Sequence, residues 1–150
     1  MKAALHLARP EDADRLDTLV AASHAERGIA TPDARRRAAL APLLEGSPHG
    51  AVYLIGPARA PVGYVVVTFG WSVEYGGLDG SVDHLYIRPP VRRRSIATEI
   101  LLSLASALSD AGLCALHMRL DRDDGTALRL SQRTGFKPRD HYMWVTRALS

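Results

Sequence analysis

The stretch SVDHLYIRPPVRRRSIATEILLSL, residues 81–104, decides the fold of this 150-residue chain. Its first half is rich in β-branched and aromatic residues, which is typical of a strand, and Pro89 and Pro90 are expected to end that strand. Its second half places apolar residues at helical spacing, so we predict a helix from about residue 94 to residue 110. A strand, a tight loop and a helix together predict a parallel connection to the next strand, with a ligand cleft at the strand ends.

Outside this stretch, strand-like and helix-like segments alternate. Runs of β-branched and aromatic residues predict strands, and glycine and proline mark their ends. In chain order, we expect a strand at 3–8, helices at 10–28 and 31–46, an antiparallel hairpin of strands at 51–56 and 62–75, a turn at 76–80, the strand at 81–89, the helix at 94–110, a strand at 111–120, a short helix at 123–136 and a last strand at 141–149. This order predicts one mixed α/β domain over residues 1–150.

Composition narrows the classes of protein. The chain has 47% hydrophobic and 23% charged residues and a formal net charge of +3, which is ordinary for a globular domain. Its single cysteine, Cys114, excludes an intrachain disulfide and is expected to be a buried core residue. No apolar run reaches the roughly 18 residues of a membrane span, and acidic residues stand where a signal peptide would be cleaved. We therefore expect a cytoplasmic protein without membrane contact. The six histidines show no metal-ligand spacing, so no metal is expected.

Two runs of three arginines carry much of the positive charge. The run at 35–37 falls in the middle of a helix and is interpreted as solvated surface. The run at 92–94 falls where a strand leads into a helix, and the free N–H groups and the dipole of a helix start attract anions. Because the planar guanidinium matches phosphate oxygens, we predict a phosphate site at this junction.

The same segment resembles the acyl-CoA-binding segment of GCN5-related N-acetyltransferases, the GNAT family. The family signature is Gln/Arg-x-x-Gly-x-Gly/Ala after a strand that ends in a Leu-Tyr-Val-x-Pro-like sequence, and VDHLYIRPPVRRRSIA is similar to it. The segments PVGYVVVTFGWSVEYGGLDG, LDRDDGTALRLSQRTGF and ARPEDADRLDTLV also resemble the family, so the likeness covers nearly the whole chain. It implies a central mixed, mostly antiparallel sheet in which the fourth and fifth strands are parallel and splay apart.

The resemblance implies that the chain transfers an acetyl group from acetyl-CoA, its cosubstrate, to a primary amine. The amine would attack the thioester directly in a ternary complex. The fourth strand would hold the thioester and pantetheine, and the loop and helix start would hold the pyrophosphate. The implied cofactor-binding residues are Leu85, Tyr86, Ile87, Arg92, Arg93, Arg94, Ser95, Ile96, Ala97, Thr98 and Asp124.

Three positions depart from the family pattern. Ser95 replaces a glycine, the residue that lets a ligand approach the backbone closely. Ser131 stands where many members have a tyrosine that protonates the leaving thiolate, which makes it a candidate catalytic residue that is a poorer acid than tyrosine. Asp124 replaces an asparagine that commonly contacts pantetheine, and an ionised aspartate cannot donate a hydrogen bond. A catalytically weak or inactive acyl-CoA-binding protein is therefore the alternative.

Candidate bases for the acceptor amine lie in or beside the third and fourth strands. A carboxylate or a histidine near the cleft could take the amine proton directly or through water, and Glu74, Asp83 and His84 are the candidates. Asp83 and His84 are neighbours on one strand and should point to opposite faces. We expect one of them to line the cleft, and the sequence does not say which.

Candidate substrate-binding residues are Trp71, Tyr75, His24 and Glu26, since aromatic side chains suit a cationic amine and the end of the first helix suits a cleft wall. The sequence does not distinguish a polyamine, an amino sugar, an amino acid or a protein N-terminus as the acceptor. A nucleic-acid partner is disfavoured because no aromatic–basic stacking motif accompanies the arginines. The apolar segment at 141–149 could pair in a homodimer.

Overall fold

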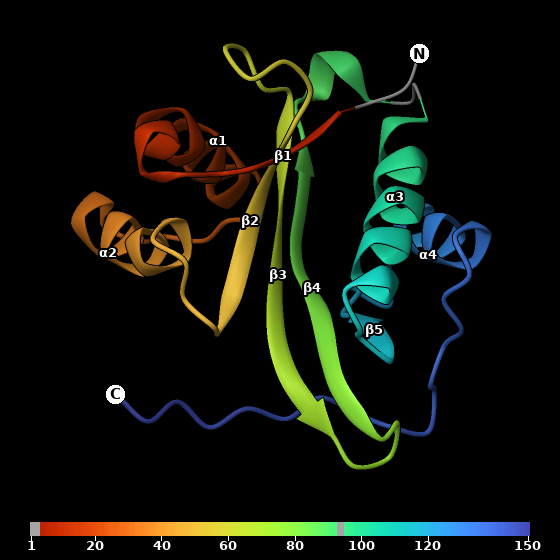
Figure 1. The fold of residues 1–150 in the computed structure, drawn as a ribbon. Coiled ribbons are helices and arrows are strands. Elements are labelled where there is room, and N and C mark those ends of the chain that lie inside the picture. The colour runs from red at the N-terminus through yellow and green to blue at the C-terminus, as the bar shows by residue number, and fades with distance from the viewer. Residues whose placement is uncertain (1–3, 93–94) are drawn as a thin grey trace.

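The structure is a computed structural model that describes residues 4–92 and 95–150, and it contains a five-stranded sheet with helices on both faces (Figure 1). Within those two ranges, no helix is both long and apolar enough to cross a membrane. The elements in chain order are β1 (Leu5–Leu7), a 3-10 turn (Pro10–Asp12), α1 (Ala13–Glu26), α2 (Asp33–Leu44), β2 (Gly50–Ile55), β3 (Gly63–Ser72), β4 (Gly77–Ile87), a 3-10 turn (Pro89–Val91), α3 (Ile96–Asp110), β5 (Ala115–Met118) and α4 (Gly125–Arg133).

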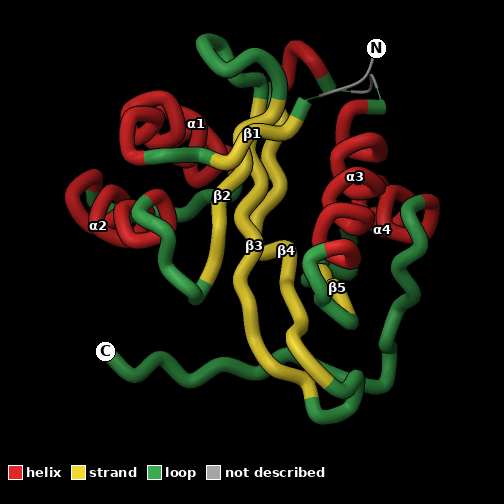
Figure 2. Tube along the Cα trace, viewed as in Figure 1, coloured by secondary structure: helices red, strands yellow, loops and turns green. Residues whose placement is uncertain are grey.

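The strands follow one another in the sheet in their chain order, β1-β2-β3-β4-β5. The first three pairings are antiparallel, and β4 pairs with β5 in parallel. Figure 2 shows the strands in yellow between the two groups of helices. The parallel pair is possible because α3 connects the two strands, as the sequence between Pro89 and residue 110 predicts. The expected mixed, mostly antiparallel sheet with a parallel pair of fourth and fifth strands is confirmed.

Two hydrophobic cores lie on the two faces of the sheet. Helices α1 and α2 cover one face, and α3 and α4 cover the other (Figure 1). Successive residues of β3 point to opposite faces, so Val66 packs in the α1–α2 core whereas Val65 and Val67 pack in the α3 core. One face of α3 is buried, through Ile100, Leu101, Leu104 and Leu108, whereas Leu102 is exposed, which confirms the amphipathic helix predicted from the apolar spacing.

The β3–β4 hairpin is longer than the sequence indicates. We expected a turn at 76–80, but β4 begins at Gly77, and Gly77 to Gly80 pair with Ser72 to Phe69. That expectation is wrong because the glycines here are strand residues. One of them, Gly80, leaves room for the side chain of Leu113. A Cβ at Gly80 would lie 3.0 Å from the Leu113 side chain.

The expected last strand at 141–149 is not formed. The segment is extended but has no strand partner among the described residues, and its large apolar side chains are exposed, including Trp144 and Val145. Its contacts are with side chains: the Arg119 guanidinium carbon lies 4.9 Å from the Trp144 ring centroid. An alternating apolar pattern does not by itself make a strand pair, and this segment does not join the outer edge of β5, the last strand of the sheet. Pairing of this segment in a homodimer stays a prediction.

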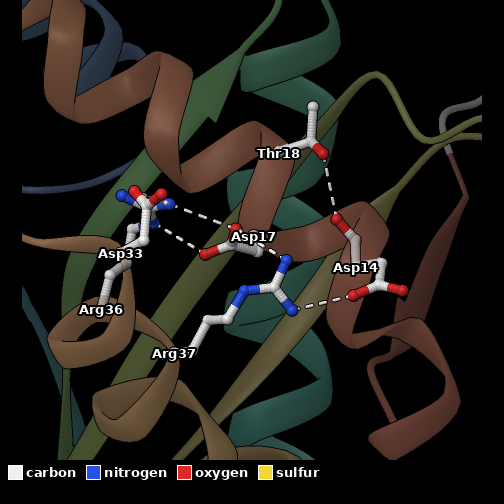
Figure 3. Close-up of polar contacts among 6 residues, drawn as sticks. All are labelled: Asp14, Asp17, Thr18, Asp33, Arg36 and Arg37. Atoms are coloured by element: carbon white, nitrogen blue, oxygen red, sulfur yellow. Dashed lines mark hydrogen bonds and ion pairs between the residues drawn. The ribbon is translucent and has the colours of Figure 1, made fainter.

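The arginine run at 35–37 is not simply solvated surface. Arg36 is buried between α1 and α2, where its guanidinium donates to both carboxylate oxygens of Asp17, at 2.7 and 3.2 Å, and to Asp33 at 2.9 Å (Figure 3). Arg37 bridges Asp17 and Asp14 at 3.2 and 2.8 Å. The interpretation as solvated surface is wrong for Arg36, because the second helix packs on the first across this ion-pair network.

Cys114 is exposed, which contradicts the expected core position. It lies one residue before β5 begins at Ala115, and its thiol donates to the Leu78 carbonyl oxygen at 3.2 Å. The strand begins after Cys114, and this side chain stays outside the core, whereas its neighbour Leu113 packs against the α3 core.

Candidate functional site

The cleft opens where the two parallel strands separate. The β4–β5 ladder ends at the pair Val82 and Met118, whereas β4 continues to Ile87 without that partner. A cleft of about 730 Å³ fills the splay. Its walls come from the end of α1, the second half of β4, the start of α3, the end of β5 and α4, through Ser23, Glu26, Arg27, Val82, Asp83, His84, Leu85, Tyr86, Ile87, Val91, Arg92, Ser95, Ile96, Ala97, Thr98, Met118, Arg119, Leu120, Asp121, Asp124, Thr126, Ala127, Leu130 and Arg133.

A bulge in β4 sits at the point of separation. Val66 pairs with His84 and Val67 pairs with Val82, so Asp83 is an extra residue on β4. A bulge interrupts the alternation of side chains along a strand. As a result Asp83 and His84 both line the cleft, and the expectation that only one of them does so is wrong.

The first turn of α3 forms one end of the cleft. Ser95 precedes the helix with φ of 61° and ψ of 13°, a left-handed conformation that favours glycine. Ser95 and the three residues after it, to Thr98, line the cleft at the helix end where N–H groups lack helical partners. This arrangement suits an anion. The predicted phosphate-binding residues Arg93 and Arg94 lie outside the described residues.

Arg92 points back toward β4 and α1. Its Nε–H donates to the Ile87 carbonyl oxygen at 2.7 Å, and its Nη2 pairs with Glu26 at 2.8 Å. The guanidinium carbon also lies 5.5 Å from the centroid of the Tyr86 ring. Arg92 therefore connects the loop after β4 to the last turn of α1, across the wall of the cleft.

His84 lies opposite that connection, between α1 and the bulge. An Arg27 N–H donates to its Nδ1, and Asp83 Oδ2 lies 3.5 Å from its Nε2. Burial is the largest cause that lowers the pKa of the His84 imidazole; the carboxylate of Asp83 opposes that effect and the guanidinium of Arg27 adds to it. A lowered pKa keeps the ring neutral near pH 7, which is the state of a proton acceptor.

Of the other candidates for the acceptor side, some lie at the cleft and some do not. Glu26 lines the cleft, and the His24 ring lies 6.0 Å from the His84 ring without being one of the lining residues. Glu74 and Tyr75 lie beyond the end of β3, where Arg139 binds both side chains, at 2.8 Å for the nearer Glu74 oxygen and at 3.1 Å for the Tyr75 hydroxyl. These two do not reach the cleft.

Trp71, near the end of β3, is 73% exposed and does not line the cleft either. The tip of the β3–β4 hairpin lies at the opposite end of β4 from the start of α3 (Figure 1). The aromatic residues of that hairpin are therefore not brought together with His84.

The two candidates on and before α4 have structural partners. Asp124 lines the cleft and caps α4, since its carboxylate accepts from the Ala127 N–H at 3.0 Å. Ser131 is buried, and its hydroxyl donates to the Leu128 carbonyl oxygen at 2.7 Å within the same helix. Ser131 is not one of the residues that line the cleft.

Sequence reasoning missed two arginines of the site. Arg27 caps the end of α1 and binds His84, and Arg119 follows β5 and lies 3.5 Å from Asp83. Its place next to His24 and Glu26 locates Arg27 at the helix end but does not indicate a contact with His84. Across residues 4–92 and 95–150, no group of three or more His, Cys, Asp or Glu side chains could hold a metal ion.

Known proteins resemble this chain in sequence and in fold. The model of the acetyltransferase (GNAT) family matches residues 16–136. A comparison with curated proteins gives no significant match. An integron cassette protein from the mobile metagenome of Cole Harbour Salt Marsh is 29% identical, with a TM-score of 0.84 over 97% of this chain and 90% of that one.

Two further solved structures are similar. A putative acetyltransferase from Arthrobacter sp. FB24 is 26% identical, with a TM-score of 0.82 over 97% of this chain and 96% of that one. AAC(6')-Iy, solved in complex with the bisubstrate analog CoA-S-monomethyl-acetylneamine, is 10% identical, with a TM-score of 0.80 over 99% of each chain. At that identity it shares the fold.

Proposed function

This chain belongs to the acetyltransferase (GNAT) family, and from that premise we propose that it transfers the acetyl group of acetyl-CoA to a primary amine. The observation that carries the proposal is the cleft in the β4–β5 splay, with the start of α3 at one end and the neutral His84 on its wall. One end suits an anionic cofactor, and the histidine suits removal of a proton.

The start of α3 would receive the pyrophosphate of acetyl-CoA. The amides of Ile96, Ala97 and Thr98 belong to the first turn, whose N–H groups lack helical acceptors. Similar structures support CoA as the ligand, because AAC(6')-Iy was solved with a CoA-based bisubstrate analog. Arg93 and Arg94 precede this turn in the sequence and would add positive charge.

The edge of β4 would hold the thioester. The Arg88 N–H donates to the Val62 carbonyl oxygen, on the side of β4 that faces β3. Because successive residues of a strand direct their N–H groups to opposite edges, the Ile87 N–H points to the other edge, toward the cleft. The Ile87 carbonyl already faces that edge, where it accepts from Arg92. A backbone N–H at this edge can stabilise the oxyanion that develops when the thioester carbonyl is attacked.

The acetyl transfer then needs no covalent enzyme intermediate. The amine nitrogen attacks the thioester carbonyl carbon, a C–N bond forms, the C–S bond breaks, and CoA leaves as a thiolate. His84 would take the proton that the amine loses, directly or through one water. Water would protonate the thiolate, since the Ser131 hydroxyl donates within its own helix. Most of the rate gain would come from holding the two reactants together.

The test has two stages. Calorimetric titration with acetyl-CoA, with CoA for comparison, measures cofactor binding, and thiol release with a panel of primary amines measures transfer. His84→Gln should lower turnover and leave acetyl-CoA affinity unchanged, with the exposed His49→Gln as the matched control. No binding of acetyl-CoA at low salt would overturn the proposal.

A second candidate function is acyl-CoA binding without catalysis. The observation that favours it is the buried Ser131 hydroxyl, which satisfies the Leu128 carbonyl and leaves no side-chain acid at the position expected for thiolate protonation. Micromolar binding of acetyl-CoA without turnover on any amine would select this candidate.

A further inference from the structure

Arg27 is a cation of the cleft that has no carboxylate partner among the described residues. Glu26 is paired with Arg92 at 2.8 Å, and Asp83 is paired with Arg119 at 3.5 Å. Within the described part of the chain, no aspartate or glutamate lies in ion-pair distance of Arg27, whose side-chain partner is the neutral ring of His84. The acceptor half of the cleft, formed by these residues, therefore carries a net positive charge at the end of α1.

Two buried polar atoms beside Arg27 also lack partners. His24 Nδ1 and the Tyr64 hydroxyl make no hydrogen bond of ordinary geometry within the described residues. Burial is the largest cause that lowers the pKa of His24, and the Arg27 charge adds to it. At Tyr64, burial raises the pKa, and the Ser23 hydroxyl and the Arg27 charge partly offset that effect. Buried polar groups in native proteins are nearly always satisfied, and since neither residue lines the cleft, ordered water is expected to satisfy these two atoms.

The Arg27 contact also occupies the atom of His84 that would act as base. A neutral imidazole has one nitrogen that accepts and one that donates. Arg27 N–H donates to Nδ1, so Nδ1 is the accepting nitrogen, and the Nε2 proton is left on the side of Asp83. A proton from the substrate cannot enter Nδ1 while Arg27 holds it.

We infer that the acceptor is an α-amino acid or a close analogue, an amine with a carboxylate beside it, and that Arg27 binds this carboxylate and thereby releases Nδ1 of His84. This inference rests on the proposed acetyl transfer and names its substrate class. The Arg27 N–H moves from Nδ1 to a carboxylate oxygen, the neighbouring amine loses a proton to Nδ1, and its nitrogen attacks the thioester. The same binding event thus fixes the substrate and exposes the base.

The charges of the acceptor half of the cleft favour a substrate that carries a carboxylate. A carboxylate beside Arg27 neutralises the positive charge that lowers the pKa of His84, which makes the ring a better proton acceptor while substrate is bound. A polyamine brings further positive charge to a region that already has an excess, and like charges repel. An amine without an anionic group leaves Arg27 on Nδ1.

The test compares each of a panel of α-amino acids with its own α-carboxamide, by acetyl-CoA-dependent thiol release, with rates expressed per free amine. We expect the carboxylate form to have a kcat/KM about 10- to 100-fold higher, the range for a hydrogen bond to a charged group. Arg27→Met should abolish that preference and raise turnover of the carboxamide, because Nδ1 is then free. Arg27→Lys should restore part of the preference.

Controls separate the possible failures. Arg35→Met, an exposed arginine of α2, should leave the preference unchanged, and acetyl-CoA affinity should be the same in all variants. Equal turnover of acids and carboxamides, or a preference that survives Arg27→Met, overturns the inference and leaves acetyl transfer standing. A protein that acetylates other primary amines but neither form of an α-amino acid overturns the inference alone. A protein that binds acetyl-CoA but acetylates no amine of either panel overturns both the inference and the proposed function.

Discussion

Asp17 is predicted to be the most costly single charge to remove from this fold. Its carboxylate is 10% exposed and accepts two hydrogen bonds from Arg36, whose side chain is 8% exposed. Asp17→Asn keeps the size of the side chain and removes the charge, which leaves a buried guanidinium without its main partner. Such a loss costs about 3–5 kcal/mol, and we expect about 3 because Asp33 still accepts from Arg36.

Asp14 provides the matched control. It lies on the same helix and binds Arg37 at 2.8 Å, but its side chain is 91% exposed. Asp14→Asn should cost about 0–1 kcal/mol, as exposed ion pairs do. Urea denaturation followed by circular dichroism measures both variants. For a chain of this size, a loss of about 3 kcal/mol corresponds to a fall in Tm of roughly 6–12 °C.

The pH dependence gives a second readout of the same contact. The hydrogen bond from Arg36 is the largest cause that holds the pKa of Asp17 below its usual value of 3.8, against the opposing effect of burial. The folded-state pKa lies below the unfolded one, so this stabilisation is complete above pH 3.8 and is lost as the pH falls through the folded pKa. The stability difference between the native protein and Asp17→Asn should therefore shrink below pH 3.8. If the free energy of unfolding of Asp17→Asn is within about 0.5 kcal/mol of that of Asp14→Asn, the reasoning is refuted.

Three further predictions concern the cleft. Ser95→Gly should raise the free energy of unfolding by about 1 kcal/mol in urea denaturation, because glycine adopts a φ of 61° without the penalty that serine bears there; no gain would mean that the strain is absent. His84→Gln should lower kcat/KM at least about 100-fold. The native kcat/KM profile should contain an acid limb below pH 6.5 that His84→Gln lacks, since the active neutral ring persists until the pH falls to its lowered pKa. The limb set by ionisation of the amine substrate should be common to both proteins, and identical profiles would exclude His84 as the base. Ser131→Ala should leave thiol release within about twofold of native, and a large loss would show that the hydroxyl leaves Leu128 to assist the thiolate.

The sequence predicts the fold well where local patterns and tertiary packing agree. The helix α3 and the strand before it could be read from residues 81–104, because apolar spacing, the two prolines and the turn all indicate the same structure. The segment at 141–149 has the pattern of a strand as well. Its pairing depends on an edge elsewhere, which no local pattern specifies, and the prediction failed there.

The site could be predicted in part. The residues of β4 and α3 that line the cleft are adjacent in sequence, so a motif locates them together. The bulge at Asp83 depends on the register between β3 and β4, and Arg27 reaches His84 from 57 positions away. Neither long-range feature has a signature in the residues next to it. The same limit explains Arg36, which local sequence places among solvated neighbours and packing buries against Asp17.

Helix α1 connects the fold to the chemistry. Asp17 anchors it to α2, and Arg27, at its end, touches His84. At about 1.5 Å of rise per residue, the two residues are roughly 15 Å apart along the helix axis, too far to interact electrostatically with much strength. Their coupling is through the rigid helix, since a shift of α1 on α2 moves the Arg27 guanidinium relative to β4. Most of the predicted acetyl-CoA contacts lie on β4 and α3 rather than on α1 or α2, although Arg92 is tied to α1 through Glu26. Loss of the Asp17 charge should therefore disturb recognition of the amine before it disturbs binding of the cofactor.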